Sequence, residues 1–149
     1  MIRMKVYNTN HKANEEERKA IIDFLYEHLE QFGDPWEDIE KAYKFALQET
    51  HSFGGFVLVS DEEGEITGVV LVNKTGMSGY IPENVLVYIA THKDYRGKGI
   101  GKALMQKTIE LADGDIALHV EPDNPARFLY EKVGFTSKYQ EMRFKQPAN

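Results

Sequence analysis

The fold is decided by an apolar run, Val85-Leu86-Val87-Tyr88-Ile89-Ala90-Thr91-His92, and by a glycine-rich turn shortly after it, Arg96-Gly97-Lys98-Gly99-Ile100-Gly101-Lys102. The run is largely apolar on both faces, as in a strand that is covered on two sides. Glycines let the backbone turn sharply and bring its N–H groups close to an oxygen-rich ligand. The helix expected over residues 99–112 adds free N–H donors and the positive end of its dipole. The stretch predicts a strand, a phosphate-binding turn and a helix.

The N-terminal half predicts a strand, two helices and a hairpin. Met1–Asn8 has the pattern of a short strand, and Asn14–Phe32 has one apolar face at helical spacing. Asp34 is the expected N-cap of a second helix that ends near Thr50. Two β-type runs, 56–59 and 66–72, flank an acidic turn and predict a hairpin.

The C-terminal part predicts two more strands around a short helix. Residues 116–121 alternate in polarity, which places His119 and Glu121 on the same side of a strand. Residues 125–133 predict a helix, and residues 139–144 predict a last strand. The order is therefore β-α-α-β-β-β-α-β-α-β. It indicates a single α/β (mixed α+β) domain over residues 1–149, with a central mixed twisted sheet and helices on both faces.

Composition narrows the classes of partner and chemistry. The chain has no cysteine, which excludes disulfides, thiolate nucleophiles and zinc–thiolate sites. A net charge of −6 disfavours nucleic acid as a partner and favours a cationic substrate. No apolar run approaches the roughly 20 residues of a membrane span. We therefore expect no membrane partner and a cytoplasmic location.

The glycine turn fits neither of two common phosphate motifs. A P-loop needs Ser or Thr after its Gly-Lys pair, and Ala103 stands there. Counted from Gly97 or Gly99, the dinucleotide pattern Gly-x-Gly-x-x-Gly lacks its third glycine. Glu121, about 20 residues further on, still leaves the dinucleotide alternative open, as does a turn that only joins a strand to a helix. The remaining pattern is Arg-x-x-Gly-x-Gly, which starts at Arg96.

Two segments together resemble the GNAT (GCN5-related) N-acetyltransferase superfamily. The first is the strand, turn and helix over residues 87–104, which is similar to that family's acetyl-CoA motif. The second resembles its Leu-Tyr-Glu-x-x-Gly-Phe segment and reads Asn124-Pro125-Ala126-Arg127-Phe128-Leu129-Tyr130-Glu131-Lys132-Val133-Gly134-Phe135. One predicted strand separates them, as in the family. The element order over the whole chain also matches the family fold.

The resemblance implies acetyl-CoA as cosubstrate and no metal. It places the acetyl and pantetheine groups against the end of the first strand and the pyrophosphate in the turn. The pantetheine contact falls on Asn124 or Asp123, because the spacing to Tyr130 leaves both open. The implied coenzyme-binding residues are Ile89, Ala90, Thr91, Arg96, Gly97, Lys98, Gly99, Ile100, Gly101, Lys102, Asn124 and Tyr130.

The resemblance also implies direct acetyl transfer to a primary amine in a ternary complex. Tyr130 matches the tyrosine that often protonates the leaving thiolate, and a buried aromatic side chain is its structural alternative. His119 and Glu121 are the first candidates for the general base, with solvent-facing strand residues as the alternative. The acceptor is a small-molecule or peptide amine, and homodimers are common in the family. A regulator that binds acyl-CoA without transfer, and an enzyme using another acyl chain, remain the alternatives.

Overall fold

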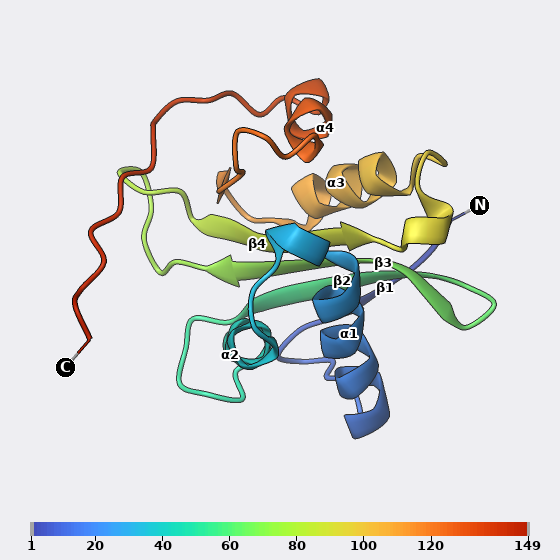
Figure 1. Ribbon diagram of the computed structural model, residues 1–149. Helices are drawn as coiled ribbons and strands as arrows, with labels where there is room; N and C mark the ends of the chain where they lie inside the picture. The colour runs from blue at the N-terminus through green and yellow to red at the C-terminus, as the bar shows by residue number, and fades with distance from the viewer. Residues whose placement is uncertain (1, 149) are drawn as a thin grey trace.

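The computed structural model describes residues 2–148 as a five-stranded sheet with helices packed on it (Figure 1). Two short 3-10 helices, η1 and η2, lie at Glu30–Phe32 and Lys93–Tyr95. The strands are β1 (Arg3–Tyr7), β2 (Gly55–Glu62), β3 (Glu65–Lys74), β4 (Asn84–Thr91) and β5 (Ile116–Leu118). The α-helices are α1 (Glu15–His28), α2 (Trp36–Ala46), α3 (Ile100–Leu111) and α4 (Ala126–Lys132).

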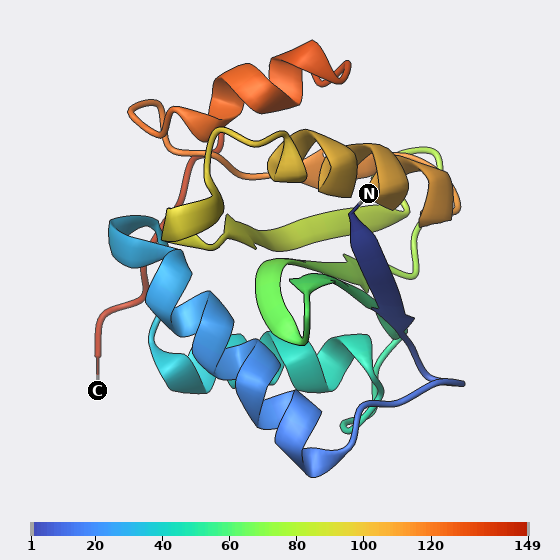
Figure 2. The same cartoon turned by 90° about the vertical axis from the view of Figure 1, so that its right-hand side faces the viewer.

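The sheet is mixed, as the sequence predicted. Its spatial order is β1-β2-β3-β4-β5, with antiparallel pairs except for the parallel pair β4–β5. Figure 2 shows α1 and α2 on one face of the sheet and α3 and α4 on the other. Strands β2, β3 and β4 are therefore covered on both sides, which explains their nearly continuous apolar sequences.

A hydrophobic core lies on each face of the sheet. On the first face, Ile22 and Leu25 of α1 and Tyr43 of α2 pack against Val69 of β3. On the second face the core includes Leu104, one of several α3 side chains that are fully shielded from solvent. Burying one aliphatic side chain contributes about 1.5–3 kcal/mol to the free energy of unfolding. The two cores pack against β4 from both faces of the sheet.

The segment between α1 and α2 differs from its prediction. The predicted helix 14–32 is interrupted because Glu30 has a φ of 54°, a left-handed conformation that an α-helix does not accommodate. Asp34 does not cap α2, whose N-cap is Pro35 without a side-chain bond. Instead the Asp34 carboxylate accepts a 2.6 Å hydrogen bond from the Tyr88 hydroxyl. Helix α2 ends at Ala46, short of the predicted Thr50.

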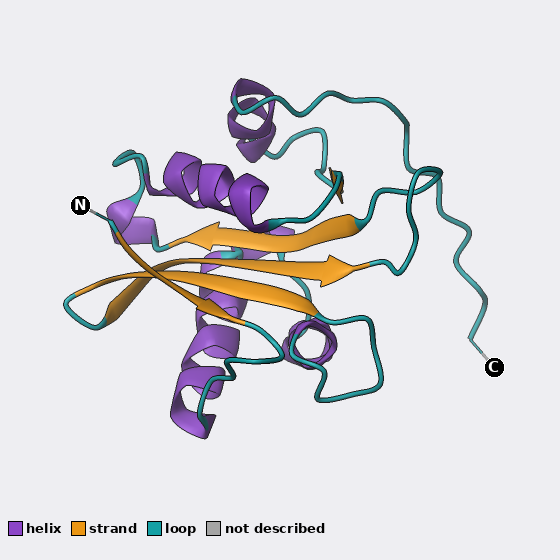
Figure 3. Ribbon diagram, turned by 180° about the vertical axis from the view of Figure 1, so that it is seen from behind, coloured by secondary structure: helices purple, strands orange, loops and turns teal. Residues whose placement is uncertain are grey.

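Of the two strands predicted near the C-terminus, one is shorter than predicted and the other does not form. The strand predicted over residues 116–121 ends at Leu118, and His119 and Glu121 lie beyond it. The strand predicted over residues 139–144 does not form, since residues 136–148 contain no helix or strand. Figure 3 shows this tail as a loop running outside the body of the molecule. A strand needs a neighbour for its backbone hydrogen bonds, and the described tail has none.

Candidate functional site

The first feature of the site is the separation of β4 from β5. The two strands pair only from Asn84↔Ile116 to Leu86↔Leu118. At the same level the β3–β4 register shifts, since Val72 pairs with Leu86 and Leu71 pairs with Tyr88. Val87 is thus the extra residue of a β-bulge, and beyond it β4 has no strand partner on its outer side. The main-chain groups of residues 87–90 on that side are available to an extended ligand, whereas the Thr91 carbonyl accepts a hydrogen bond from Arg96 Nε at 3.4 Å.

The second feature is the glycine turn between η2 and α3. Gly97 and Gly99 have φ values of 79° and 81°, which L side chains rarely adopt. A Cβ added at either glycine would meet no protein atom within 4 Å. The turn, the end of β4 and Leu129 of α4 line one open pocket. The space beside these two glycines is therefore free for a ligand to approach the backbone.

The main-chain amides of this turn are not used by the protein. Helix α3 has Gly99 as its N-cap, without a side-chain cap and without an acidic residue in its first turn. The first N–H to find a partner is that of Ala103, which donates to the Gly99 carbonyl. Within the described residues, the N–H groups from Gly99 to Lys102 have no hydrogen-bond acceptor. Such a helix start is suited to an anion.

The charged side chains of the turn have unequal roles. Arg96 pairs with Glu30 at 2.7 Å and donates to the main-chain carbonyl of His28 at 3.1 Å, so it ties the turn to the end of α1. Lys98 lies over the Tyr95 ring at 5.1 Å, and Lys98 and Lys102 are both exposed. The two lysines are therefore the side-chain charges left free for a ligand, whereas Arg96 has protein partners.

Tyr130 is the buried candidate for proton transfer. It lies on α4, is 7% exposed and packs in the core between the sheet and α3. Burial raises the pKa of its phenol to about 12. The group therefore keeps its proton at neutral pH, as a proton donor must. The same packing shows that Tyr130 is also a core residue.

The other predicted catalytic residues are less firmly placed. His119 and Glu121 are exposed and lie after the end of β5, so they do not share a strand face as predicted. Asn124 is half-buried, and its Oδ1 accepts the N–H of Ala126, which leaves its amide group for a ligand. Asp123 is exposed. Ile100 is buried, so only its backbone can take part in binding.

Two interactions near β4 were missed by sequence reasoning. Tyr88 and Asp34 join β4 to the segment after η1, across 54 residues of sequence. The His28 ring packs on that of His92 with centroids 4.2 Å apart, and His28 Nδ1 accepts the Lys93 N–H. Burial is the main cause that lowers the pKa of His28. His28 lies four residues after Phe24 and three after Leu25, and this helical spacing is the one signal that the sequence offers for its burial.

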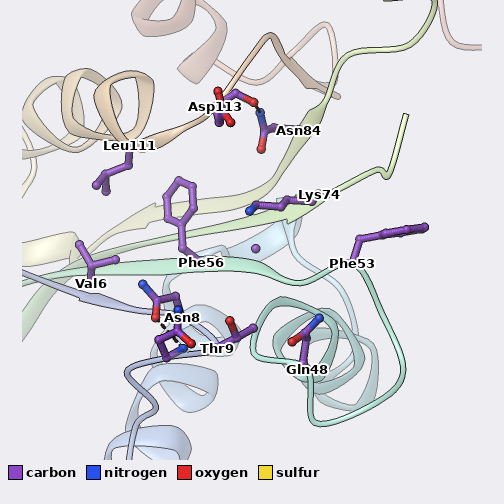
Figure 4. A pocket seen from close by; sticks show the side chains of 12 residues that line it. Val6, Asn8, Thr9, Gln48, Phe53, Phe56, Lys74, Asn84, Leu111 and Asp113 are labelled. Atoms are coloured by element: carbon purple, nitrogen blue, oxygen red, sulfur yellow. Dashed lines mark hydrogen bonds between the residues drawn. The ribbon is translucent and has the colours of Figure 1, made fainter. Parts of the chain in front are cut away.

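A second pocket lies at the opposite end of β4. It is lined by Phe56, Lys74 and Asn84, among others from β1, β2 and the end of α3. Figure 4 shows Asn84 turned toward Asp113, and the amide of Asn84 donates to the Asp113 carbonyl at 3.0 Å. Asn84 begins β4 and Thr91 ends it, so this pocket is separate from the glycine turn.

Glu83 has a structural role at this end. Its carboxylate accepts the N–H groups of Asp115 and Gly79, and these backbone bonds, that of Asp115 foremost, lower its pKa. Among residues 2–148 no three His, Asp or Glu side chains gather as metal ligands would. No described helix is both long and apolar enough to cross a membrane.

The fold and the turn define a class of protein: an α/β domain with an uncapped helix start at the end of a central strand. Comparison with known sequences gives the family. The sequence model of the "Acetyltransferase (GNAT) family" matches residues 21–135, more than half of the chain. The chain belongs to this acetyltransferase family.

Individual relatives agree with this assignment. The chain is 31% identical over 109 residues to "[Ribosomal protein bS18]-alanine N-acetyltransferase" of Haemophilus influenzae, covering 66% of this chain and 75% of that one. It is 31% identical over 84 residues to "5-NmdU N-acetyltransferase" of Pseudomonas phage PaMx11, covering 55% of this chain and only 58% of the phage protein.

A solved structure supports the fold. Ribosomal-protein-alanine N-acetyltransferase from Brucella melitensis biovar Abortus 2308 superposes with a TM-score of 0.64 at 19% identity. The match covers 98% of this chain and 99% of that one. The GNAT fold predicted from the sequence is thereby confirmed.

Proposed function

We propose that the protein transfers the acetyl group of acetyl-CoA to a primary amine by direct attack in a ternary complex. The observation that carries the proposal is the set of free main-chain amides from Gly99 to Lys102 at the start of α3. Unpaired N–H groups at a helix start bind phosphate oxygens, and Lys102 adds a nearby positive charge. The pyrophosphate of the coenzyme would lie there.

The unpaired edge of β4 would hold the rest of the coenzyme. Beyond Leu86 the strand has no neighbour on its outer side, so the outward-facing main-chain groups at Ile89, Ala90 and Thr91 can bond the amides of the pantetheine arm. The free amide group of Asn124 is a further candidate contact, with Asp123 as the alternative. The thioester would then lie beside the bulge at Val87, where backbone N–H groups can stabilise an oxyanion.

The transfer then needs a general acid that protonates the leaving thiolate and a general base that takes the proton from the amine. A neutral amine nitrogen attacks the thioester carbonyl carbon, the C–N bond forms, and the C–S bond breaks with its electron pair on sulfur. Tyr130 gives its phenol proton to the thiolate and regains one from solvent. His119 or Glu121, both exposed near the end of β5, takes the proton from the new ammonium centre directly or through water.

An amine as the acetyl acceptor is supported by the net charge of the chain and by the names of its relatives. A net charge of −6 attracts a cationic amine from solution. The names of the two relatives specify N-acetylation of an alanine of ribosomal protein bS18 and of 5-NmdU. We infer a primary amine acceptor of either small-molecule or peptide type.

The test is thiol release from acetyl-CoA with a panel of amines, including peptides with a free N-terminus. Tyr130→Phe should lower kcat by about 100-fold or more while the Kd for coenzyme stays within about threefold. Tyr26→Phe, on the exposed surface of α1, is the matched control and should leave both values unchanged. Coenzyme binding without transfer to any amine would instead assign a regulatory role, and faster turnover of a longer acyl-CoA would change the acyl chain.

A further inference from the structure

The end of α1 lies beside η2 (Figure 2), and two histidine rings meet there. His28 is the last residue of α1, and His92 is the N-cap of η2. Their ring centroids are 4.2 Å apart. The Nδ1 atom of His28 accepts the N–H of Lys93 at 3.3 Å. The Nδ1 atom of His92 accepts the N–H of Asp94 at 3.1 Å, so each ring binds one of two consecutive N–H groups of η2.

Both rings are neutral in this arrangement. A ring nitrogen that accepts a hydrogen bond carries no proton, so neither Nδ1 atom is protonated. The Nε2 atom of His28 then carries the proton of that ring and lies 2.8 Å from the Glu27 carboxylate. Burial, ahead of the charge of His92, lowers the pKa of His28. The neutral state of His28 therefore belongs to the folded structure itself.

His92 is the more accessible of the two rings. Its side chain is 16% exposed, against 4% for His28. Its Nε2 atom lies 3.6 Å from the Glu65 carboxylate, so a charged ring would have an anionic neighbour. A proton taken up by His92 would occupy Nδ1 and remove the acceptor of a main-chain N–H of η2. The charged and titratable side chains that face the pair are Glu27 of α1, Glu65 of β3, and Lys93, Asp94, Tyr95 and Arg96 of η2 and the turn.

The short helix η2 joins the two rings to the glycine turn. The His92 carbonyl accepts the N–H of Tyr95 at 2.9 Å, and the two rings pack edge to face with centroids 5.4 Å apart. The next residue, Arg96, donates to the His28 carbonyl at 3.1 Å, and Gly97 follows it. These contacts anchor the turn just before the free amides that start α3. Only the last turn of α1 takes part, so a change in its first turn leaves this anchor intact.

We propose that His28 and His92, both neutral, are positioning residues for the glycine turn, and that coenzyme binding weakens when His92 takes up a proton. The inference rests on the proposed function, since coenzyme A is the ligand whose affinity it describes. A proton on Nδ1 replaces an acceptor by a donor, so the N–H of Asp94 loses its partner and η2 loses its cap. The amides of residues 99–102 are then no longer held in one arrangement before the ligand arrives, and that loss of preorganisation costs affinity.

The first test is the Kd for coenzyme A from about pH 8 to about pH 6, on either side of the roughly 6.5 at which an unperturbed histidine titrates. Calorimetry measures it for the wild type and for His92→Asn, because asparagine also caps a helix start with its side-chain oxygen but does not titrate. At about pH 8 the two should agree within about twofold, whereas His92→Ala should bind about fivefold more weakly. As the pH falls to about 6, the Kd of the wild type should rise about threefold or more relative to that of His92→Asn.

The comparison with His92→Asn separates positioning of the turn from simple support of the fold. Phosphate groups also take up a proton at about pH 6, and the ratio of the two Kd values removes that effect. His51→Asn, at an exposed position after α2, is the matched control and should keep the pH profile of the wild type. Parallel profiles for the wild type and His92→Asn, or a His92→Ala variant that binds like the wild type, would overturn the proposal. The profiles alone decide it if His92→Ala does not fold.

The second test uses the protein without coenzyme, so it separates this inference from the proposed function. NMR of the ¹⁵N-labelled chain follows the His92 ring and the main-chain N–H signals of Gly97 to Lys102 over the same pH range. We expect the turn signals to shift together with the titration of the His92 ring, and to stay in place in His92→Asn. A turn that keeps its signals while His92 titrates, or a His92 ring that stays neutral down to about pH 6, would contradict the proposal. A wild type that binds no coenzyme A would instead contradict the proposed function, and this titration would still decide the role of the two histidines.

Discussion

Helices α1 and α3 begin in opposite ways. Asn14 and Glu17 cap α1 reciprocally, since the Asn14 side chain accepts the Glu17 N–H and the Glu17 carboxylate accepts the Asn14 N–H. Three glutamates, at positions 15, 16 and 17, lie in its first turn. Helix α3 begins at Gly99 with no cap, no acidic residue and free amides. A helix that only supports the fold satisfies its own donors, whereas a helix that binds an anion leaves them open.

The largest effect should come from giving α3 an acidic start like that of α1. Gly99→Asp places a carboxylate where the pyrophosphate would bind, and should raise the Kd for coenzyme A by about 1,000-fold, roughly 4 kcal/mol. Gly79→Asp is the matched control, since Gly79 has a similar φ of 78° and open space around it but precedes β4. Calorimetry measures both, and equal Kd values for the two variants would refute the role of the turn.

Reversing the free charge of the first turn should have a smaller effect. Lys102→Glu should weaken coenzyme binding by about tenfold to a hundredfold, because it replaces attraction by repulsion at the positive end of the helix. Lys107→Glu, on the same helix, makes the same change in net charge and should alter the Kd by less than about threefold. Arg96→Gln should act mainly on stability, since Arg96 is already paired with Glu30. An equally large increase in the Kd for Lys107→Glu would mean that coenzyme binding depends on the net charge of the protein and not on the position of Lys102.

Removing the cap of α1 should change stability and leave binding alone. Asn14→Ala should lower the free energy of unfolding by about 1 kcal/mol, because the Glu17 N–H loses its acceptor. Urea unfolding measures the loss, and the Kd for coenzyme A should match that of the wild type. A weakened Kd would show that α1 and the turn are coupled through Arg96, His28 and Glu30.

The smallest effect is a pH dependence from the same cap. Hydrogen bonds to the Glu17 carboxylate, the Asn14 N–H first, lower its pKa from 4.5 to about 2. A folded-state pKa below the unfolded value contributes stability above about pH 4.5, and that contribution is lost as the pH falls toward 2. Glu17→Gln should therefore lose less stability than the wild type over this range. Parallel pH profiles for the two proteins would contradict the prediction.

The local pattern of apolar residues and glycines was sufficient to predict most of the fold. The runs that form β2, β3 and β4 are mostly apolar. The turn at Gly97–Gly101 has three glycines in five residues, which is typical of a backbone that turns sharply or approaches a ligand closely. The mixed sheet and the uncapped helix start follow from those two features. The local pattern could not predict which residues far apart in the sequence would form contacts with each other.

The errors share that cause. Asp34 has the chemistry of an N-cap, but its carboxylate is used by Tyr88, 54 residues away. Arg96 stays a predicted phosphate ligand, but local pattern did not show that Glu30 and the His28 carbonyl pair with it. Residues 139–144 have the alternation of a strand, but no strand partner among residues 2–148. Each outcome depends on a partner that local periodicity does not identify.

The central claim is that the main-chain amides at the start of α3 are free and bind the diphosphate of the coenzyme. The most direct measurement is amide-resolved NMR of the ¹⁵N-labelled protein during titration with coenzyme A. We predict large shifts and slowed hydrogen exchange for Gly97 to Lys102, and none for Glu15 to Glu17 at the capped start of α1. Saturation of the protein with coenzyme A while the signals of Gly97 to Lys102 stay unchanged would contradict the account.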